Sequence, residues 1–191
     1  FSEDVVNLIQ ESHGKAKVIT INNLFANIDD LTAFINIATN LLDKDGCLVI
    51  ESSYLFDMID HMVFELIYHE HLSYFSLNPL QGFFAKFGME IWAVEHINTK
   101  GGSLRYYISK IGIHPVEDSV SDLSRKELTG ISLREKFLVF ADEIGKQKAS
   151  LITFLQSLKG KVVVGYGASA TSTTLISHFG LQDYLSFLVD D

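Results

Sequence analysis

The sequence predicts an α/β fold, and three observations support this. In the first half of the chain, short apolar runs typical of strands alternate with amphipathic helical stretches, which is the pattern of a β-α-β unit. Two later strand-like runs are joined by a short glycine-containing link, as in an antiparallel pair. Near the end, a strand-like run, a glycine-rich turn, a helix and a further strand-like run predict a second β-α-β unit.

The first predicted β-α-β unit spans two apolar runs and the helix between them. Residues 17–22 are rich in valine and isoleucine, which predicts a strand buried on both faces. A helix should begin at Asp29 or Asp30 and stop at the Asp-Gly pair 45–46, before a strand over residues 47–51. The two strands should be parallel, with a right-handed crossover.

A helix and an antiparallel pair follow. Asn78 is expected to be the N-cap of this helix and Pro79 its first residue, and the helix should end near Gly88. Residues 89–97 and 103–111 predict the two antiparallel strands.

The composition becomes more polar and helical after residue 113, which predicts a domain boundary there. We therefore expect domains over residues 1–113 and 114–191. The second should contain a long amphipathic helix, a strand over 161–165, a glycine-rich turn, a helix ending near Phe179 and a strand over 185–189.

Composition excludes several classes of protein. The 191 residues are 47% hydrophobic and carry a formal charge of −9, which would repel nucleic acid and anionic lipid surfaces. Cys47 is the single cysteine, so the chain holds no disulfide framework and no zinc cluster. No apolar stretch approaches the roughly 20 residues that span a bilayer. We expect a soluble, cytoplasmic protein.

The densest polar cluster lies in residues 67–75, Ile-Tyr-His-Glu-His-Leu-Ser-Tyr-Phe. A histidine, with an ordinary pKa of about 6.5, suits general base catalysis near neutral pH, and a neighbouring carboxylate can orient it. The alternative is that these groups cap turns and satisfy buried backbone. A metal site is disfavoured, because the spacing is not His-Glu-x-x-His and helix positions two apart do not face each other.

Two turns after predicted strands are further candidate sites. Asn22 and Asn23 follow the first parallel strand, at the edge where open α/β sheets bind ligands, although asparagines also end strands for conformational reasons alone. Residues 165–170, Gly-Tyr-Gly-Ala-Ser-Ala, follow a later strand, and such a turn can present backbone N–H groups to a phosphate. This turn lacks a third glycine, so a purely structural tight turn is an equal reading.

Four segments together resemble the sugar C-methyltransferases, which use S-adenosylmethionine to methylate nucleotide-linked keto-deoxysugars. The segments are Asn-Asn-Leu-Phe-Ala at 22–26, the string at 67–75, Gly-Gly-Ser-Leu-Arg at 101–105 and the turn at 165–170. Their order covers nearly the whole chain, and the Tyr-His-Glu-His-Leu-Ser-Tyr-Phe string is the most specific of them.

The resemblance implies a domain plan. The family has an N-terminal zinc-binding domain, a central methyltransferase domain and a C-terminal Rossmann-like domain. By this plan the chain is a fragment: the second half of the Rossmann-like methyltransferase domain, with its antiparallel pair, followed by part of the C-terminal domain. The zinc site, the first glycine-rich cofactor loop and most contacts to S-adenosylmethionine then lie outside residues 1–191.

The resemblance also implies catalytic roles. His71 is the general base that removes the proton from the carbon next to the sugar ketone. Glu70 orients or electrostatically supports His71, and Tyr68 hydrogen-bonds the sugar or its developing oxyanion. The methyl group then passes from the sulfonium to that carbon, a step for which the protein mainly supplies proximity and orientation.

Binding roles follow in the same way. Asn22 and Asn23 lie near the cofactor, Arg105 meets the phosphates of the sugar nucleotide, and Tyr166 and Ser169 bind that substrate through the glycine-rich turn. No metal ligand is expected in the chain.

Two positions depart from the family pattern, and two other functions stay open. Asn27 stands where the family commonly has an active-site histidine, and Thr171 stands where a basic residue is common. A first alternative is a sugar-nucleotide-binding module without catalysis. A second is a nucleotide-dependent oxidoreductase that uses residues 165–170, for which the sequence alone shows no acidic partner.

Overall fold

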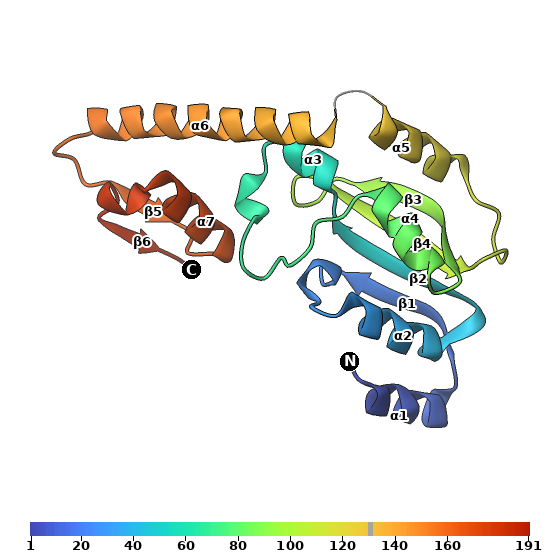
Figure 1. The fold of residues 1–191 in the computed structure, drawn as a ribbon. Helices are drawn as coiled ribbons and strands as arrows, with labels where there is room; N and C mark the ends of the chain where they lie inside the picture. Colours follow the sequence, from blue (N-terminus) through green and yellow to red (C-terminus); the bar gives the residue numbers. More distant parts are fainter. Residues whose placement is uncertain (130–131) are drawn as a thin grey trace. The chain divides into compact units, whose positions relative to one another are not determined.

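The computed structural model describes residues 1–129 and 132–191 (Figure 1), and the chain divides into two compact units. The first unit contains Phe1–Asp57 and Leu72–Gly130, and the second contains Met58–His71 and Ile131–Asp191. A short segment from the middle of the sequence thus belongs to the unit that also holds the C-terminal part. The domain boundary expected after residue 113 stays a prediction.

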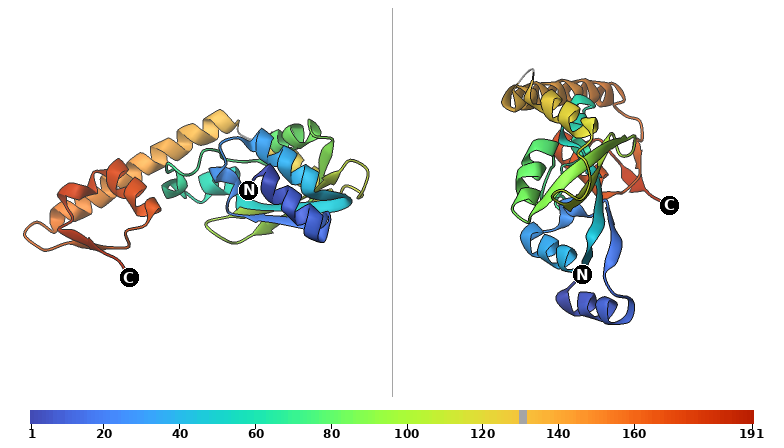
Figure 2. Two further views of the ribbon diagram at one scale, coloured as in Figure 1. Left: turned by 90° about the horizontal axis from the view of Figure 1, so that it is seen from below. Right: turned by 90° about the vertical axis from the view of Figure 1, so that its right-hand side faces the viewer.

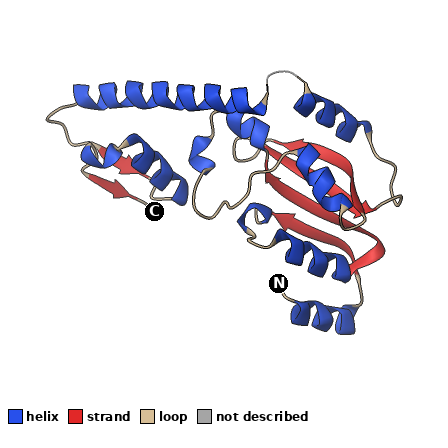
Figure 3. Ribbon diagram, in the orientation of Figure 1, coloured by secondary structure: helices blue, strands red, loops and turns tan. Residues whose placement is uncertain are grey.

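The first unit is built on a four-stranded mixed sheet, which confirms the α/β class (Figure 3). Its strands are β1 (Ala16–Asn22), β2 (Leu42–Ser53), β3 (Met89–Ile97) and β4 (Ser103–Lys110), and their order is β1-β2-β4-β3. β1 and β2 are parallel, as expected of a β-α-β unit. β4 lies antiparallel to both β2 and β3, so the predicted antiparallel pair joins the parallel strands in one sheet.

Helices cover one face of this sheet. α2 (Leu31–Leu41) connects β1 to β2, and α4 (Leu77–Ala85) lies on the same side (Figure 2). Asp30 caps α2 by accepting a hydrogen bond from Ala33 N at 2.8 Å, so the expected start of this helix is confirmed. The buried core between helices and sheet is formed mainly by Ile35, Leu48, Ile50, Leu77, Phe84, Leu104, Tyr106 and Ile108.

The expectation that β1 is buried on both faces is wrong. Val18 is 59% exposed, and Ile21 is the buried residue of this strand. The described part of the chain pairs β1 with β2 alone and places α2 and α4 over one face of the sheet. A run of valine and isoleucine therefore predicted the strand correctly but could not show which of its faces is covered.

The expected break at residues 45–46 is also wrong, because both lie inside β2. Gly46 allows a close approach: a Cβ there would lie 3.0 Å from the carbonyl oxygen of Ala16 and 2.8 Å from the side chain of Leu42. The register between β1 and β2 is irregular at this point. The Asp-Gly pair thus permits backbone contact within the sheet and forms no turn.

Helix α4 begins one residue before the expected N-cap. Its N-cap position is Ser76, whose side chain makes no capping hydrogen bond, and Asn78 lies within the first turn. Glu127 of α5 (Asp118–Leu128) takes the capping role. Its carboxylate accepts hydrogen bonds from Leu77 N at 2.6 Å, Asn78 N at 2.9 Å and Asn78 Nδ2 at 2.8 Å. A carboxylate at a helix N-terminus is favourable, so α5 completes α4.

Two tyrosines of this unit are buried and differ in how their hydroxyl groups are bonded. Tyr54 donates its O–H to Glu127 at 3.1 Å, whereas the Tyr106 hydroxyl is buried and has no hydrogen-bond partner. Burial raises the pKa of both phenols, and the Glu127 carboxylate adds to the effect, so both stay protonated.

The second unit contains the predicted second β-α-β unit. β5 (Val164–Tyr166) and β6 (Phe187–Val189) are parallel and flank α7 (Ala170–Phe179). Both strands begin later than expected, and the long predicted helix is confirmed as α6 (Leu133–Ser157). Residues 58–71 bring the end of α3 (Leu55–Asp60) and the short 3-10 helix η2 (Phe64–Leu66) into this unit.

We expect Glu127→Ala to lower the free energy of unfolding by about 2–3 kcal/mol, because it removes the acceptor of two backbone N–H groups and one phenol. Chemical denaturation followed by circular dichroism measures this. Asp122→Ala, which removes an exposed partner of Arg125 on the same helix, is the control and should cost less than about 0.5 kcal/mol. Equal effects of the two variants would contradict the capping role.

The two phenols should respond oppositely to the loss of a hydroxyl. Tyr106→Phe removes a buried group without a partner, so we expect stability to stay unchanged or to rise by about 1 kcal/mol. Tyr54→Phe removes a hydrogen bond to Glu127 and should lower stability by about 1 kcal/mol. Thermal unfolding of both variants tests the difference, and a destabilised Tyr106→Phe would show that this hydroxyl has a partner in solution.

Candidate functional site

His71 is held in one tautomer by its own segment. Its Nδ1 lies 2.9 Å from the carbonyl oxygen of Leu66, the last residue of η2, and its backbone N donates to Tyr68 O at 3.0 Å. A carbonyl oxygen only accepts hydrogen bonds, so the proton of the neutral imidazole lies on Nδ1. Nε2 then carries the lone pair and accepts the O–H of Tyr68 at 3.1 Å.

This arrangement gives His71 the properties of a general base. The unprotonated nitrogen is Nε2, and the Leu66 carbonyl stabilises the ring further when Nε2 takes a proton and the imidazolium forms. The Tyr68 ring lies against the imidazole, with centroids 4.3 Å apart, so a proton donor and a proton acceptor are in direct contact. The pair can remove a proton and donate a hydrogen bond to the oxygen that becomes negative.

Glu70 lies differently from its expected place. Its carboxylate is 4.0 Å from Nε2 of the neighbouring His69, and the side chain is 56% exposed. The orientation of His71 is explained by the Leu66 carbonyl, which sequence analysis did not single out because a backbone acceptor leaves no signal in residue identity. A supporting role of Glu70 stays a prediction.

The two asparagines end β1 as expected. Asn22 is exposed and lies opposite Glu51 of β2, and Asn23 has φ 53° and donates its N–H to Glu51 O at 2.9 Å. Asparagine tolerates this left-handed conformation, which accounts for its presence at the turn without a ligand. The side-chain amide of Asn22 is nevertheless open at the carboxyl edge of the parallel strands, where ligands bind in such sheets.

The turn after β1 is joined to the residues that follow His71. Ala26 O accepts hydrogen bonds from Leu72 N at 2.8 Å and Ser73 N at 3.2 Å. The next residue, Asn27, has a buried side-chain oxygen with no hydrogen-bond partner. Such an acceptor is costly, so this position, where the expected histidine is replaced, keeps an unused polar group.

The candidate residues are divided between the two units. His71, Glu70, Tyr68, Tyr166 and Ser169 belong to the second unit. Asn22, Asn23 and Arg105 belong to the first. Within the second unit the structure brings Tyr68 and His71 together, and within the first it pairs Asn22 and Arg105 with the same strand, β2.

Arg105 is already paired with two carboxylates. Its Nη2 and Nε lie 2.8 and 3.2 Å from Oε2 of Glu51, which is 8% exposed, and its Nη1 lies 3.0 Å from Glu95. Hydrogen bonding to Glu51 is the main cause that raises the pKa of Arg105. One cation between two anions leaves a local excess of negative charge, which opposes the expected contact with phosphates.

The glycine-rich turn is bonded to residues 189–191. Ala168 N donates to Oδ2 of Asp190 at 3.0 Å, Gly167 N donates to Val189 O at 2.8 Å, and the Tyr166 hydroxyl donates to Asp191 at 2.7 Å. A carboxylate thus occupies the position of an anionic ligand. Asp190, which directly follows β6, is thus an acidic residue bonded to this turn, and the oxidoreductase alternative stays untested.

The start of α7 accounts for Ser169 without a ligand. The Ser169 side chain caps the helix by accepting from Ser172 N, and its hydroxyl also contacts that of Thr171 at 2.8 Å. Residues 1–129 and 132–191 contain no cluster of three or more histidine, cysteine or acidic residues that could hold a metal ion. Within the same ranges no helix is both long and apolar enough to cross a membrane.

Comparison with known proteins finds a family match for each half of the chain. A family model described as a methyltransferase domain matches residues 1–94, and one described as the C-methyltransferase C-terminal domain matches residues 98–191. The chain belongs to the C-methyltransferase family. The C-methyltransferase NovU of Streptomyces niveus is 30% identical over 185 residues, which are 95% of this chain and 44% of NovU. The chain thus spans less than half the length of this curated relative.

The boundary between the two family models differs from the division into two compact units. It falls between residues 94 and 98, at the end of β3, whereas β3 and β4 form one antiparallel pair in the first unit. The resemblance drawn from four short segments is confirmed at the level of the family. The roles of the individual residues are not tested by it.

We expect Arg105→Met to lower the free energy of unfolding of the protein by about 2 kcal/mol, because it leaves the buried Glu51 carboxylate without its Arg105 partner. The double variant Arg105→Met/Glu51→Gln should recover most of the loss, and Arg125→Met, at an exposed pair, is the control. Denaturation and calorimetric titration with thymidine diphosphate measure both effects. Unchanged stability with weakened nucleotide binding would instead favour the expected phosphate contact.

Proposed function

We propose that the protein transfers a methyl group from S-adenosylmethionine to the carbon next to the ketone of a nucleotide-linked keto-deoxysugar, with Nε2 of His71 as the general base. The observation that carries this proposal is the hydrogen bond from His71 Nδ1 to Leu66 O, which leaves Nε2 basic and in contact with Tyr68. Membership of the C-methyltransferase family supports the reaction class.

The first step is proton removal. Nε2 of His71 takes the proton from the carbon next to the ketone, and the electron pair of that C–H bond forms an enolate whose charge lies on the former ketone oxygen. The substrate C–H has to replace the Tyr68 O–H at Nε2, whose single lone pair takes one proton, so the Tyr68 O–H is released and donates to the enolate oxygen. One pair of side chains thus serves both the proton and the charge.

The second step is methyl transfer to the enolate carbon. S-adenosylmethionine supplies, when bound, a methyl group on a positively charged sulfur. The exposed amide of Asn22 at the carboxyl edge of β1 offers both a donor and acceptors, which suits the amino-acid and ribose groups of that cofactor, and Asn23 fixes the backbone of the same turn. We expect most of the cofactor site to lie outside residues 1–191.

The nucleotide part of the substrate is proposed to bind at residues 165–169. Tyr166 is 73% exposed and could stack on a base, and Ser169 lies at the N-terminus of α7, where an anion is favoured. The hydrogen bond from Ala168 N to Asp190 would have to open for a phosphate to enter. We also propose that the protein is cytoplasmic, that it binds neither nucleic acid nor membrane, and that residues 1–191 supply no metal ligand.

Hydrogen exchange tests the base without the cofactor. A thymidine-diphosphate keto-deoxysugar is incubated in deuterated water with the complete gene product that carries residues 1–191, and NMR follows the proton next to the ketone. We expect exchange in the parent and a loss of at least about 100-fold in His71→Asn, because this variant removes the basic nitrogen that the proposal assigns to proton removal. Tyr68→Phe should slow exchange less and mainly lower the rate constant at saturation.

The matched control is His69→Asn, which removes an exposed imidazole two residues away and should leave exchange unchanged. Binding of the substrate without exchange, in parent and variants alike across several keto-sugars, would contradict the methyltransferase proposal and favour the sugar-nucleotide-binding module. Exchange that persists in His71→Asn would assign the base to another residue.

A further inference from the structure

Residues 64–67, which include the carbonyl that orients His71, are bonded to helix α7, more than 100 residues further along the chain. We call these residues the His71-orienting segment. The hydroxyl of Thr174, in the middle of α7, donates to the carbonyl oxygen of Ile67 at 3.0 Å. Both residues belong to the second unit. A threonine on a helix usually bonds its own helix, as Thr173 does with Ser169 O at 3.4 Å, so the bond from Thr174 to a distant segment is informative.

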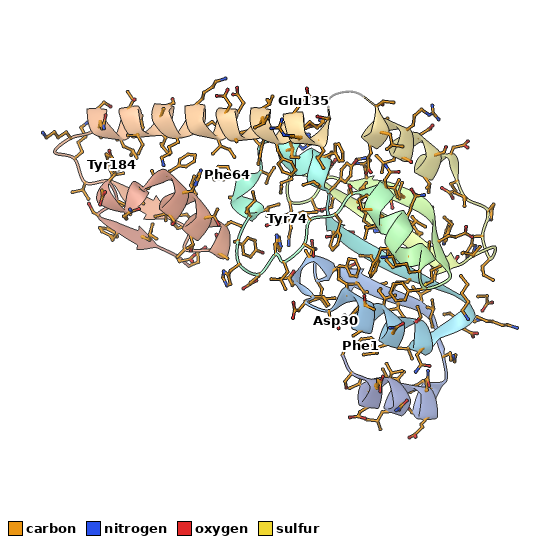
Figure 4. The ribbon with its side chains drawn as sticks, viewed as in Figure 1. Phe1, Asp30, Phe64, Tyr74, Glu135 and Tyr184 are labelled. Atoms are coloured by element: carbon orange, nitrogen blue, oxygen red, sulfur yellow. The ribbon has the colours of Figure 1, made fainter. Side chains whose placement is uncertain are left out.

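A second contact fixes the same segment. Phe64, labelled in Figure 4, lies in η2. Its ring stacks on Phe179 with centroids 5.2 Å apart and planes 13° apart, and the centroid of the His178 ring lies 6.0 Å from that of Phe64. Phe64 and Phe179 are both buried. Stacked aromatic rings in a buried position resist displacement, so the start of the segment is held by packing and its end by the Thr174 hydrogen bond.

The two anchored carbonyl groups are consecutive. Leu66 O accepts the Nδ1 proton of His71, and Ile67 O accepts the Thr174 hydroxyl. Only the N and Cα atoms of Ile67 separate the two carbonyl groups, and the peptide bond itself is planar, so φ and ψ of Ile67 set the direction of one carbonyl relative to the other. The direction of the Leu66 carbonyl, which selects the tautomer of His71, is therefore coupled to the bond from α7.

We propose that Thr174 is a positioning residue that keeps the proton of His71 on Nδ1 and so keeps Nε2 available as the base. The proposal rests on the function proposed above for His71. It assigns to the C-terminal β-α-β unit a part in the proton-transfer step, in addition to any part in binding the nucleotide.

Three variants separate the hydrogen bond from the shape of the side chain. Thr174→Val removes the hydroxyl at nearly constant volume, Thr174→Ser keeps it, and Thr173→Val removes a hydroxyl from the exposed side of the same helix. Thermal unfolding of each variant checks that the protein folds. The complete gene product is used throughout.

Two readouts are needed. Nitrogen-15 NMR of the histidine side chains reports which nitrogen of His71 carries the proton, and deuterium exchange of the keto-sugar reports the base. A neutral hydrogen bond accounts for roughly a fivefold change in an equilibrium. We therefore expect Thr174→Val to raise the Nε2-protonated fraction of neutral His71 several-fold and to lower the saturated exchange rate about fivefold, with KM little changed.

Thr174→Ser should restore parent values, and Thr173→Val should not depart from them. An unchanged His71 tautomer in a folded Thr174→Val would overturn the proposal. A loss of exchange without a tautomer change would also overturn it, because it would point to a general structural effect. If the parent shows no exchange but its tautomer responds to Thr174→Val, the positioning role holds and the proposed methyltransferase function fails.

Discussion

The hydrogen bond between His71 Nδ1 and the Leu66 carbonyl is the constraint on which the chemistry of the second unit depends. It fixes where the proton of the neutral ring lies, and Tyr68 then has one possible partner on that ring, Nε2. The short helix η2 places this carbonyl, and Phe64 and Ile67 tie the segment around it to α7. A backbone group thus determines the reactivity of a side chain.

The first unit uses a carboxylate in a similar way, to complete a local structure from a distance. Glu127 satisfies the first N–H groups of α4 and the hydroxyl of Tyr54, which brings the end of β2, the start of α4 and helix α5 together. Arg105 likewise neutralises the buried Glu51. The Arg105 charge, which the sequence suggested for phosphates, is thus neutralised within the unit.

The sequence predicted what depends on short-range patterns. The β-α-β units, the antiparallel pair, the Asp30 cap and the family followed from periodicity, glycine positions and local strings. What failed depends on contacts between distant segments: the exposed face of β1, the role of Gly46, the cap at Glu127 and the pairing of Arg105. Asp190 was visible, but its bond to Ala168 needs the parallel pairing of β5 and β6.

Residues 58–71 are an insertion in topological terms, because the chain leaves the first unit after Asp57, contributes these residues to the second, and returns at Leu72. The second unit consequently contains residues 58–71, which come from the first half of the sequence. Chimeric proteins that exchange C-terminal halves at a junction near residue 113 would separate residues 58–71 from helices α6 and α7, which they contact through Asp60 and Ile67. Each such exchange would place the α7 helix of another protein against Phe64 and Ile67. The two parent proteins must therefore share the residues of α7 and of residues 58–71 that make these contacts.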